Sequence, residues 1–159
     1  MPLNLTKKKM IVAKINKIDK CSLSAVIADF TGVNTNSLTL LRKKSQKNNV
    51  SVIIVRNRLL KLIMQNSNFQ CLKSQLNGPI LIGYSLKHPG AAARLFTEFA
   101  KINNNFKIKS AAFNKKLIDI DILASLPTYN EALSRFLHII KEISVGKFVK
   151  ILTAIKNIK

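Results

Sequence analysis

The stretch Val50–Val55 reads VSVIIV, and the polar pair Arg56-Asn57 follows it directly. Five of its six residues are β-branched and aliphatic, which is the composition of a strand. A short run with one polar residue predicts a largely buried strand rather than a strand with one buried and one solvent-exposed face. We therefore expect a sheet in which one strand leads straight into a charged segment.

The segments on either side of this strand alternate in type. Further runs of strand-forming residues predict strands over 22–30, 80–84 and 106–113. Apolar residues at helical spacing predict helices over 6–19, 34–48, 57–65 and 89–102, with another short turn in 69–76. The helix at 89–102 is expected to begin at Pro89, where a missing N–H group costs nothing. In the last strand, alternation places Phe106, Ile108 and Ala112 on one face.

The predicted order is a helix followed by β-α-β-α-β-α-β, which indicates an α/β fold with a sheet of about four strands and covering helices. The order of the strands is left open, and so is the choice between a parallel and a mixed sheet.

The C-terminal part of the chain has a different character. Asp119–Ser125 predicts a short helix that Pro127 ends, and Thr128-Tyr-Asn-Glu131 matches a capping box that starts a new helix. We therefore divide the chain into an α/β domain over 1–118, a short helix and hinge over 119–127, and a C-terminal helix over 128–159.

This last helix contains an internal repeat. The ten residues SRFLHIIKEI, from Ser134, correspond to GKFVKILTAI, from Gly146, at an offset of 12 residues or about 18 Å of helix. Each copy has an apolar stripe: Phe136, Ile140 and Ile143, then Phe148, Leu152 and Ile155. Two interpretations stay open, a helix packed back on its own domain and a repeated docking site for helices of another protein. On a straight α-helix the stripes would face directions about 120° apart, unless the helix bends near Gly146.

The net charge is +20, from 27 basic and 7 acidic residues, and such an excess indicates a polyanionic partner. Lysine is also encoded by AT-rich codons, so genome composition offers a second explanation for part of it. Residues 1–110 hold 19 basic and 3 acidic residues, whereas 111–159 hold 8 and 4, so we assign the polyanion contact to the front of the chain. The candidate RNA-binding residues are Lys7, Lys8, Lys9, Arg42, Lys43, Arg56, Asn57, Arg58, Lys87 and His88.

Catalytic motifs are missing from the sequence. It has no glycine-rich phosphate loop, no zinc spacing and no nucleophile elbow, so we expect no enzyme, no cofactor and no metal. Asp29, at a strand end, is interpreted as a loop cap rather than a site residue. Cys21 and Cys71 are expected to be reduced and partly buried. No apolar run approaches the length of a membrane span, and we expect a cytoplasmic protein.

Several segments together resemble the bacterial large-subunit ribosomal protein ten family, the base of the ribosomal stalk. The resemblance covers essentially the whole chain and is carried by the order of LNL (3–5), LSAVIAD (23–29), VRN (55–57), FQCLK (69–73), HPGAAARLF (88–96) and LPTY (126–129). Several positions where relatives often carry acids or alanine hold Lys, Asn or Ile here, so the extra lysines are weak guides to contacts.

The resemblance implies a ferredoxin-like α/β plait that binds large-subunit rRNA at the stalk base, beside a neighbouring ribosomal protein. It also implies a C-terminal helix that holds dimers of the small acidic stalk proteins, which recruit translational GTPases. Arg56 and Asn57 match the family's RNA-side motif, and the tail repeat matches its docking helix. Two copies of the repeat precede Lys159, so we expect two acidic dimers per chain.

Three alternatives remain open at this point. A non-ribosomal RNA-binding protein would share the basic front of the chain. A nuclease or RNA-modifying enzyme would need clustered carboxylates or a cofactor loop. A cationic membrane-surface protein would use the amphipathic tail.

Overall fold

The sheet of the molecule has five strands in the order β2-β3-β1-β4-β5, all antiparallel to their neighbours. The computed structural model describes residues 4–65 and 67–149. The strands are β1 (Ser24–Asp29), β2 (Val50–Ile54), β3 (Ile80–Ser85), β4 (Lys107–Phe113) and β5 (Lys116–Ile118). The predicted α/β class is confirmed, and the order of the first four strands is that of the split β-α-β plait. The sheet is neither parallel nor mixed, because β3 inserts between β1 and β2.

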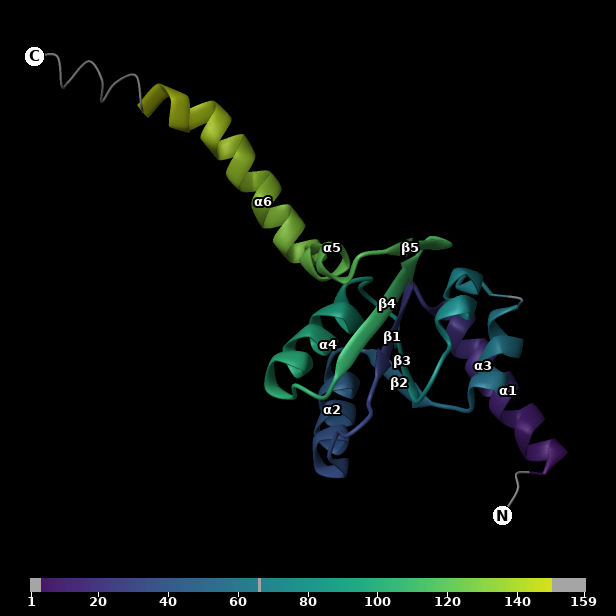
Figure 1. Cartoon of the computed structure of the whole chain (residues 1–159). Helices are drawn as coiled ribbons and strands as arrows, with labels where there is room; N and C mark the ends of the chain where they lie inside the picture. Colours follow the sequence, from purple (N-terminus) through teal and green to yellow (C-terminus); the bar gives the residue numbers. More distant parts are fainter. Residues whose placement is uncertain (1–3, 66, 150–159) are drawn as a thin grey trace, which may run out of the picture. The chain divides into compact units, whose positions relative to one another are not determined.

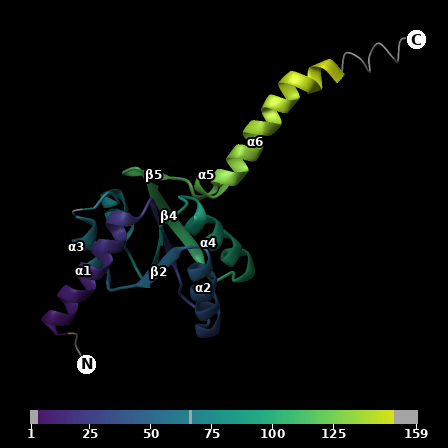
Figure 2. The ribbon, with the colours of Figure 1, turned by 180° about the vertical axis from the view of Figure 1, so that it is seen from behind.

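Helices cover both faces of this sheet (Figures 1 and 2). On one face lie α1 (Leu5–Cys21), α3 (Asn57–Met64) and the 3₁₀ helix η1 (Gln70–Gln75), and on the other lie α2 (Thr35–Lys47), α4 (Ala91–Ile102) and α5 (Ile120–Ser125). β1 is buried on both faces, so its alternate residues enter two separate cores. Gly83 of β3 allows a close approach of α4: a Cβ atom there would lie 2.6 Å from Cζ of Phe96.

Strand β2, which begins with the VSVIIV run, lies at the edge of the sheet. Val50 is buried, but Ser51, Val52 and Ile53 are only partly buried and Ile54 is 39% exposed. The prediction of a largely buried strand is therefore wrong, because β2 has a hydrogen-bonded neighbour on one side only. Apolar composition indicates a strand but not its position in the sheet, and the burial of its side chains depends on that position.

Strand β4 contains a bulge that its sequence pattern conceals. Ile27 pairs with Ser110 but Ala28 pairs with Ile108, so Lys109 is the extra residue. The bulge reverses the alternation, and Ile108 therefore lies in the same core as Ala111 instead of with Ala112. The predicted face of Phe106, Ile108 and Ala112 is wrong for this reason. A turn with positive φ at Asn114 and Lys115 then leads into β5, which was not predicted.

Helix α4 begins two residues later than expected. Pro89 lies in a turn before the helix, and its carbonyl accepts hydrogen bonds from the hydroxyls of Ser24 (2.6 Å) and Ser85 (3.3 Å). The Ser85 hydroxyl also accepts from the Ala92 N–H group and so caps the helix from the neighbouring strand.

By its internal contacts the chain divides into two units, Met1–Leu126 and Pro127–Lys159. Helix α5 belongs to the first unit, where Leu123 is fully buried against α4. The Arg94 guanidinium holds it there, since Nε donates to the Ala124 carbonyl (2.9 Å) and an Nη donates to that of Leu126 (2.6 Å). The second unit consists of α6 (Tyr129–Lys141) and the π-helical turn η2 (Glu142–Gly146), followed by helix to residue 149.

Candidate nucleic-acid interface and docking helix

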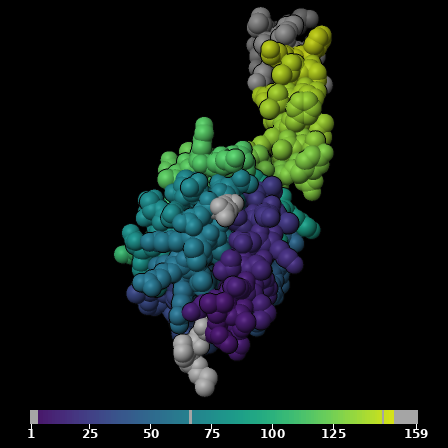
Figure 3. Space-filling model, turned by 90° about the vertical axis from the view of Figure 1, so that its right-hand side faces the viewer, coloured from purple at the N-terminus to yellow at the C-terminus, as the bar shows by residue number. Residues whose placement is uncertain are grey.

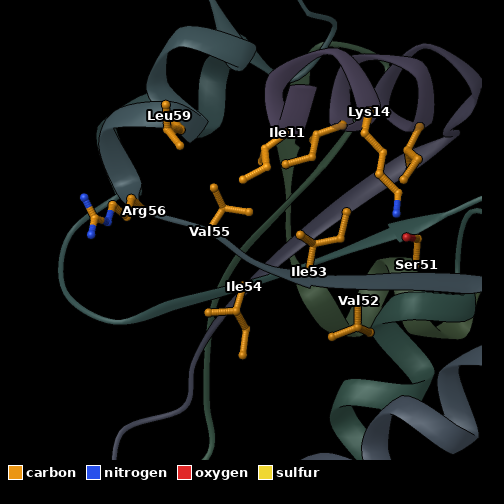
Figure 4. Close-up of a pocket in the computed structure, with 11 residues that line it drawn as sticks. Ile11, Lys14, Ser51, Val52, Ile53, Ile54, Val55, Arg56 and Leu59 are labelled. Atoms are coloured by element: carbon orange, nitrogen blue, oxygen red, sulfur yellow. The ribbon is translucent and has the colours of Figure 1, made fainter. Parts of the chain in front are cut away.

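Arg56 links the edge strand β2 to α3 and lies at the start of that helix. Its side chain is exposed, and no side chain caps the N-terminus of α3. Figure 4 shows the guanidinium directed away from Ile53 and Ile54. Arg58, in the first turn of α3, is exposed as well. Two guanidinium groups beside free backbone N–H groups at a helix start form an arrangement that suits a phosphate.

A groove of about 500 Å³ lies beside this helix start, between α1 and β2. Its walls are mainly aliphatic, and Arg56 and Lys14 are the basic residues that line it. Lys14 was missed by the sequence prediction. Lys14 lies seven positions after Lys7, so the two side chains project from one face of α1. Figure 3 shows the side of the first unit on which α1 lies. The spacing of Lys7 and Lys14 was the signal that could have identified it.

The three consecutive lysines near the N-terminus lie in the first turns of α1, which Asn4 caps by accepting from the Leu5 N–H group. Lys7 and Lys9 are exposed and Lys8 is half-buried. Neighbouring residues of a helix project about 100° apart, so these lysines point in three directions. At most two of them can face one RNA strand.

The remaining candidates lie at the other end of β2. Val50 pairs with Ser85 in the register of β2 and β3, so Lys87 lies beyond the first residue of β2, while Arg56 lies two residues beyond its last, Ile54. A five-residue strand, about 17 Å, separates the two positions. Arg42 and Lys43 are exposed on α2, which covers the opposite face from α1. The structure therefore splits the ten candidates into two basic groups.

Two of the candidates have internal hydrogen bonds. The Asn57 amide nitrogen donates to the carbonyls of Gly78 (2.8 Å) and Leu76 (3.5 Å), and so holds the loop that leads into β3. Nδ1 of His88 accepts from the Gly90 N–H group (3.0 Å) in the turn before α4. The Asn57 side chain thus fixes a loop beside Arg56 and Arg58, and the His88 side chain fixes the turn that follows Lys87.

Asp29 caps a loop, as the sequence indicated. Its Oδ1 accepts from the Thr31 hydroxyl (2.5 Å) and N–H group (3.0 Å), and its Oδ2 lies 3.3 Å from Nζ of Lys109. The Thr31 hydroxyl, followed by the Thr31 N–H group and Lys109, holds the pKa of this carboxyl below its usual value. Asp29 therefore stays ionised, and Lys109 balances its negative charge within the protein.

A buried polar pair lies between α1 and β3. Asp19 is 5% exposed and Tyr84 is fully buried, and neither Oδ1 of Asp19 nor the Tyr84 hydroxyl has a well-formed hydrogen bond. Burial raises the pKa of Asp19 to about 6, against the opposing effect of the Ser67 and Tyr84 hydroxyls. Burial also raises the pKa of Tyr84. This pair lies in the core of the first unit, apart from the basic groups.

The described residues, 4–65 and 67–149, hold no group of three His, Cys, Asp or Glu side chains that could bind a metal. Cys71 is half-buried as expected, but Cys21 is exposed, because it is the last residue of α1. Within the same residues no helix is long and apolar enough to cross a membrane.

Helix α6 exposes its apolar residues. The capping box is present: the Glu131 N–H group donates to the Thr128 hydroxyl, and the Thr128 N–H group donates to the Glu131 carboxylate. No residue of α6 is buried. Phe136 is 60% exposed and Phe148, in the second repeat, is 70% exposed. Ile140 and Ile143 are exposed too, whereas Leu152 and Ile155 lie outside the described residues. An exposed apolar stripe of this kind is typical of a protein-binding surface.

Comparison with known proteins extends these observations. A family model described as "Ribosomal protein L10" matches residues 3–101. The chain is 49% identical to the large ribosomal subunit protein uL10 of Pasteurella multocida over 157 residues, which cover 99% of this chain and 96% of the relative. It is 48% identical to the protein of the same name from Erwinia tasmaniensis, over all of this chain and 97% of that relative.

Proposed function

This chain belongs to the ribosomal protein L10 family, and from that membership we propose that its first unit binds large-subunit rRNA at the stalk base while its C-terminal helix holds dimers of acidic stalk proteins. As a member of the family it is a structural, non-enzymatic constituent of the large subunit of the cytoplasmic ribosome.

The observation that carries the proposal is the contrast between the two units. The first has two buried cores and its own helix caps, and residues 1–110 hold 19 of the 27 basic residues. The second is a capped helix with no buried residue in α6 and with Phe136, Ile140 and Ile143 exposed. A helix that buries nothing within its own chain is suited to an apolar partner, and a basic folded unit is suited to a polyanion.

For the rRNA contact, the support comes from Arg56 and its surroundings. Arg56 and Arg58 are exposed at the uncapped start of α3, and Lys14 lies across the groove on α1. Helix N-termini and guanidinium groups bind phosphate oxygens, whereas sequence-specific contacts need base edges. We assign phosphate contacts to this end of β2, and a second set to Arg42, Lys43 and Lys87 at its other end.

For the partner contact, the support is the apolar stripe of α6 together with its basic flanks. Arg135, Lys141 and Lys147 are exposed beside the stripe, and such residues attract an acidic partner before apolar surface is buried. Through these dimers the chain would recruit translational GTPases indirectly. A neighbouring ribosomal protein completes the proposed set of partners.

The test is a titration of the full chain against a transcript of the stalk-base rRNA at several salt concentrations. About six phosphate contacts predict a log–log salt slope of magnitude ~4–5. Arg56→Ala should weaken binding more than Lys115→Ala, since Lys115 belongs to neither basic group and lies in the turn between β4 and β5, at the edge of the sheet opposite β2. Binding that does not depend on salt, or an equal loss in both variants, would contradict the RNA assignment. Binding to anionic vesicles as tight as to RNA would favour a membrane-surface protein.

A further inference from the structure

Strand β2 leaves one edge of the sheet open. Within residues 4–65 and 67–149 its only sheet neighbour is β3, and the register between the two runs without a bulge from Val50 to Ile54. Proteins usually protect such an edge with a charge, a proline, a bulge or a very short strand. The opposite edge follows this rule, since β5 has three residues and begins with Lys116. β2 has five residues and contains neither a charge nor a proline, so its edge is unprotected.

The backbone groups of β2 point alternately to β3 and to the open edge. The Leu86 N–H group donates a hydrogen bond of 3.2 Å to the Asn49 carbonyl, directly before the strand. Hydrogen-bonded positions recur at every second residue of an antiparallel pair, so the next one in β2 is Ser51. The N–H and C=O groups of Val52 and Ile54 then point outward. An extended chain alongside β2 can bond to them, which is the mode of binding called β-strand addition.

A cavity lies on each side of this open edge. The groove of about 500 Å³ between α1 and β2 lies on one face of the sheet, and a cavity of about 380 Å³ between α2 and β2 lies on the other. Ser51 and Val52 line both, so the two cavities meet the same stretch of the strand. In Figure 4, Ile53 is directed toward α1 and Val52 to the opposite side. Alternate side chains of a strand added beside β2 would therefore enter the two cavities in turn.

The lining of the cavities indicates what such a strand should carry. The cavity on the α1 side is mainly aliphatic, and the cavity on the α2 side is more polar. In the described part of the chain, the charged residues that line them are all basic: Lys14 and Arg56 on the α1 side, and Arg42 on the α2 side. These three side chains are exposed. An extended segment with aliphatic residues on one face and carboxylates at its ends matches this surface in shape and in charge.

We infer that the open edge of β2 binds an extended, acidic segment of another protein as a sixth strand of the sheet. RNA supplies phosphates for the same cations, but it has no aliphatic side chains for the groove and no peptide backbone to pair with β2. A second copy of this chain would bring two net charges of +20 together. Because Lys14 and Arg56 are also assigned to rRNA, the acidic segment and rRNA compete for this edge. That competition rests on the proposed function, whereas the strand addition does not.

The probe is a capped, fluorescent heptapeptide with isoleucine at three alternate positions, threonine between them and glutamate at both ends. Fluorescence anisotropy with the full-length chain measures its Kd. Two isomers of the peptide are methylated at backbone nitrogens, one at the isoleucines and the other at the threonines and the last glutamate. Only one of these sets faces β2 in an added strand. One isomer should therefore bind at least about tenfold more weakly than the parent, and the other should stay within about threefold of it.

Variants of the chain locate the site. Val52→Pro removes an outward N–H group at a position where an edge strand tolerates proline, so the affinity for the peptide should fall at least about tenfold. Lys14→Glu should weaken binding by about threefold or more. Lys116→Glu is the matched control, because it changes the net charge equally at the opposite edge of the sheet and should leave the Kd unchanged. Excess stalk-base rRNA transcript should displace the peptide from the unmodified chain.

The inference is overturned if the peptide does not bind, if both methylated isomers lose affinity equally, or if Lys14→Glu and Lys116→Glu have equal effects. Simultaneous binding of peptide and rRNA would overturn the competition. A dimer of the free chain that Val52→Pro dissociates would assign the edge to a second copy instead of an acidic segment. A chain that binds the peptide but no rRNA would contradict the proposed function and leave the strand addition intact.

Discussion

The amide nitrogen of Asn57 donates a hydrogen bond of 2.8 Å to the carbonyl oxygen of Gly78, which joins the start of α3 to the loop before β3. Asn57 follows Arg56, and sequence alone suggested the same role in RNA binding for both. The structure separates them, because Arg56 extends into solvent while the Asn57 side chain is engaged within the protein. The two residues should therefore respond differently to substitution.

Asn57→Ala should lower the free energy of unfolding by about 1 kcal/mol, since it removes a hydrogen bond to a loop carbonyl. Arg56→Ala should leave that free energy unchanged and weaken RNA binding. Urea unfolding monitored by circular dichroism measures the first effect, and RNA titration measures the second. Equal stability of the two variants would show that the Asn57 bond does not hold the loop.

The buried carboxyl of Asp19 should make stability depend on pH. Burial raises its pKa to about 6 in the folded chain, above the value of about 3.9 in an unfolded one. The folded state therefore binds this proton more tightly. The resulting contribution to the free energy of unfolding is fully present below pH 4 and is lost as the pH rises through about 6. Asp19→Asn should stabilise the protein by up to about 3 kcal/mol at pH 7.5 and by much less at pH 4.

Unfolding free energies measured across this pH range test the effect, with Asp121→Asn as the control, because Asp121 is exposed on α5. If Asp19→Asn raised the free energy of unfolding by the same amount at pH 4 and pH 7.5, packing rather than ionisation of Asp19 would be responsible.

Arg94 should prove structural although it is a basic residue. Its guanidinium binds the carbonyls of Ala124 and Leu126, and a single lysine ammonium cannot reproduce both bonds with the same geometry. Arg94→Lys should cost about 1–3 kcal/mol of stability and increase hydrogen exchange in α5. Arg135→Lys, on exposed α6, should change neither quantity. An unchanged rate of hydrogen exchange in α5 of Arg94→Lys would contradict the structural role of Arg94.

A chain that ends at Thr128 tests whether the two activities reside in separate units. The shortened chain retains the five strands, both cores and helix α5, and it lacks α6. It should bind the rRNA fragment with unchanged affinity and capture no acidic stalk protein. Capture of that protein by the shortened chain would show that the docking surface lies in the first unit.

The order of elements was predictable because strand composition and helical periodicity are local properties of the sequence. The capping box at Thr128 and Glu131 was predictable for the same reason. Strand order was not, because Val50–Ile54 has the same composition whether β2 lies at the centre or at the edge. The bulge at Lys109 and the role of Asn57 depend on partners far away in sequence. A bend near Gly146 was left open, but its form, a π turn over Glu142–Gly146, was not predictable because an alignment of repeats counts residues and does not measure rotation.

One chain should hold rRNA and two acidic dimers at the same time, and native mass spectrometry of the ternary mixture measures this composition. The chain, a stalk-base rRNA transcript and excess acidic stalk protein should give one complex that contains one RNA, one chain and two dimers. Phe136→Asp and Phe148→Asp should each reduce the complex to one dimer without loss of RNA, because a charge replaces an apolar anchor. Three dimers on the wild type, a single dimer, or displacement of RNA by the dimers would contradict the proposed function.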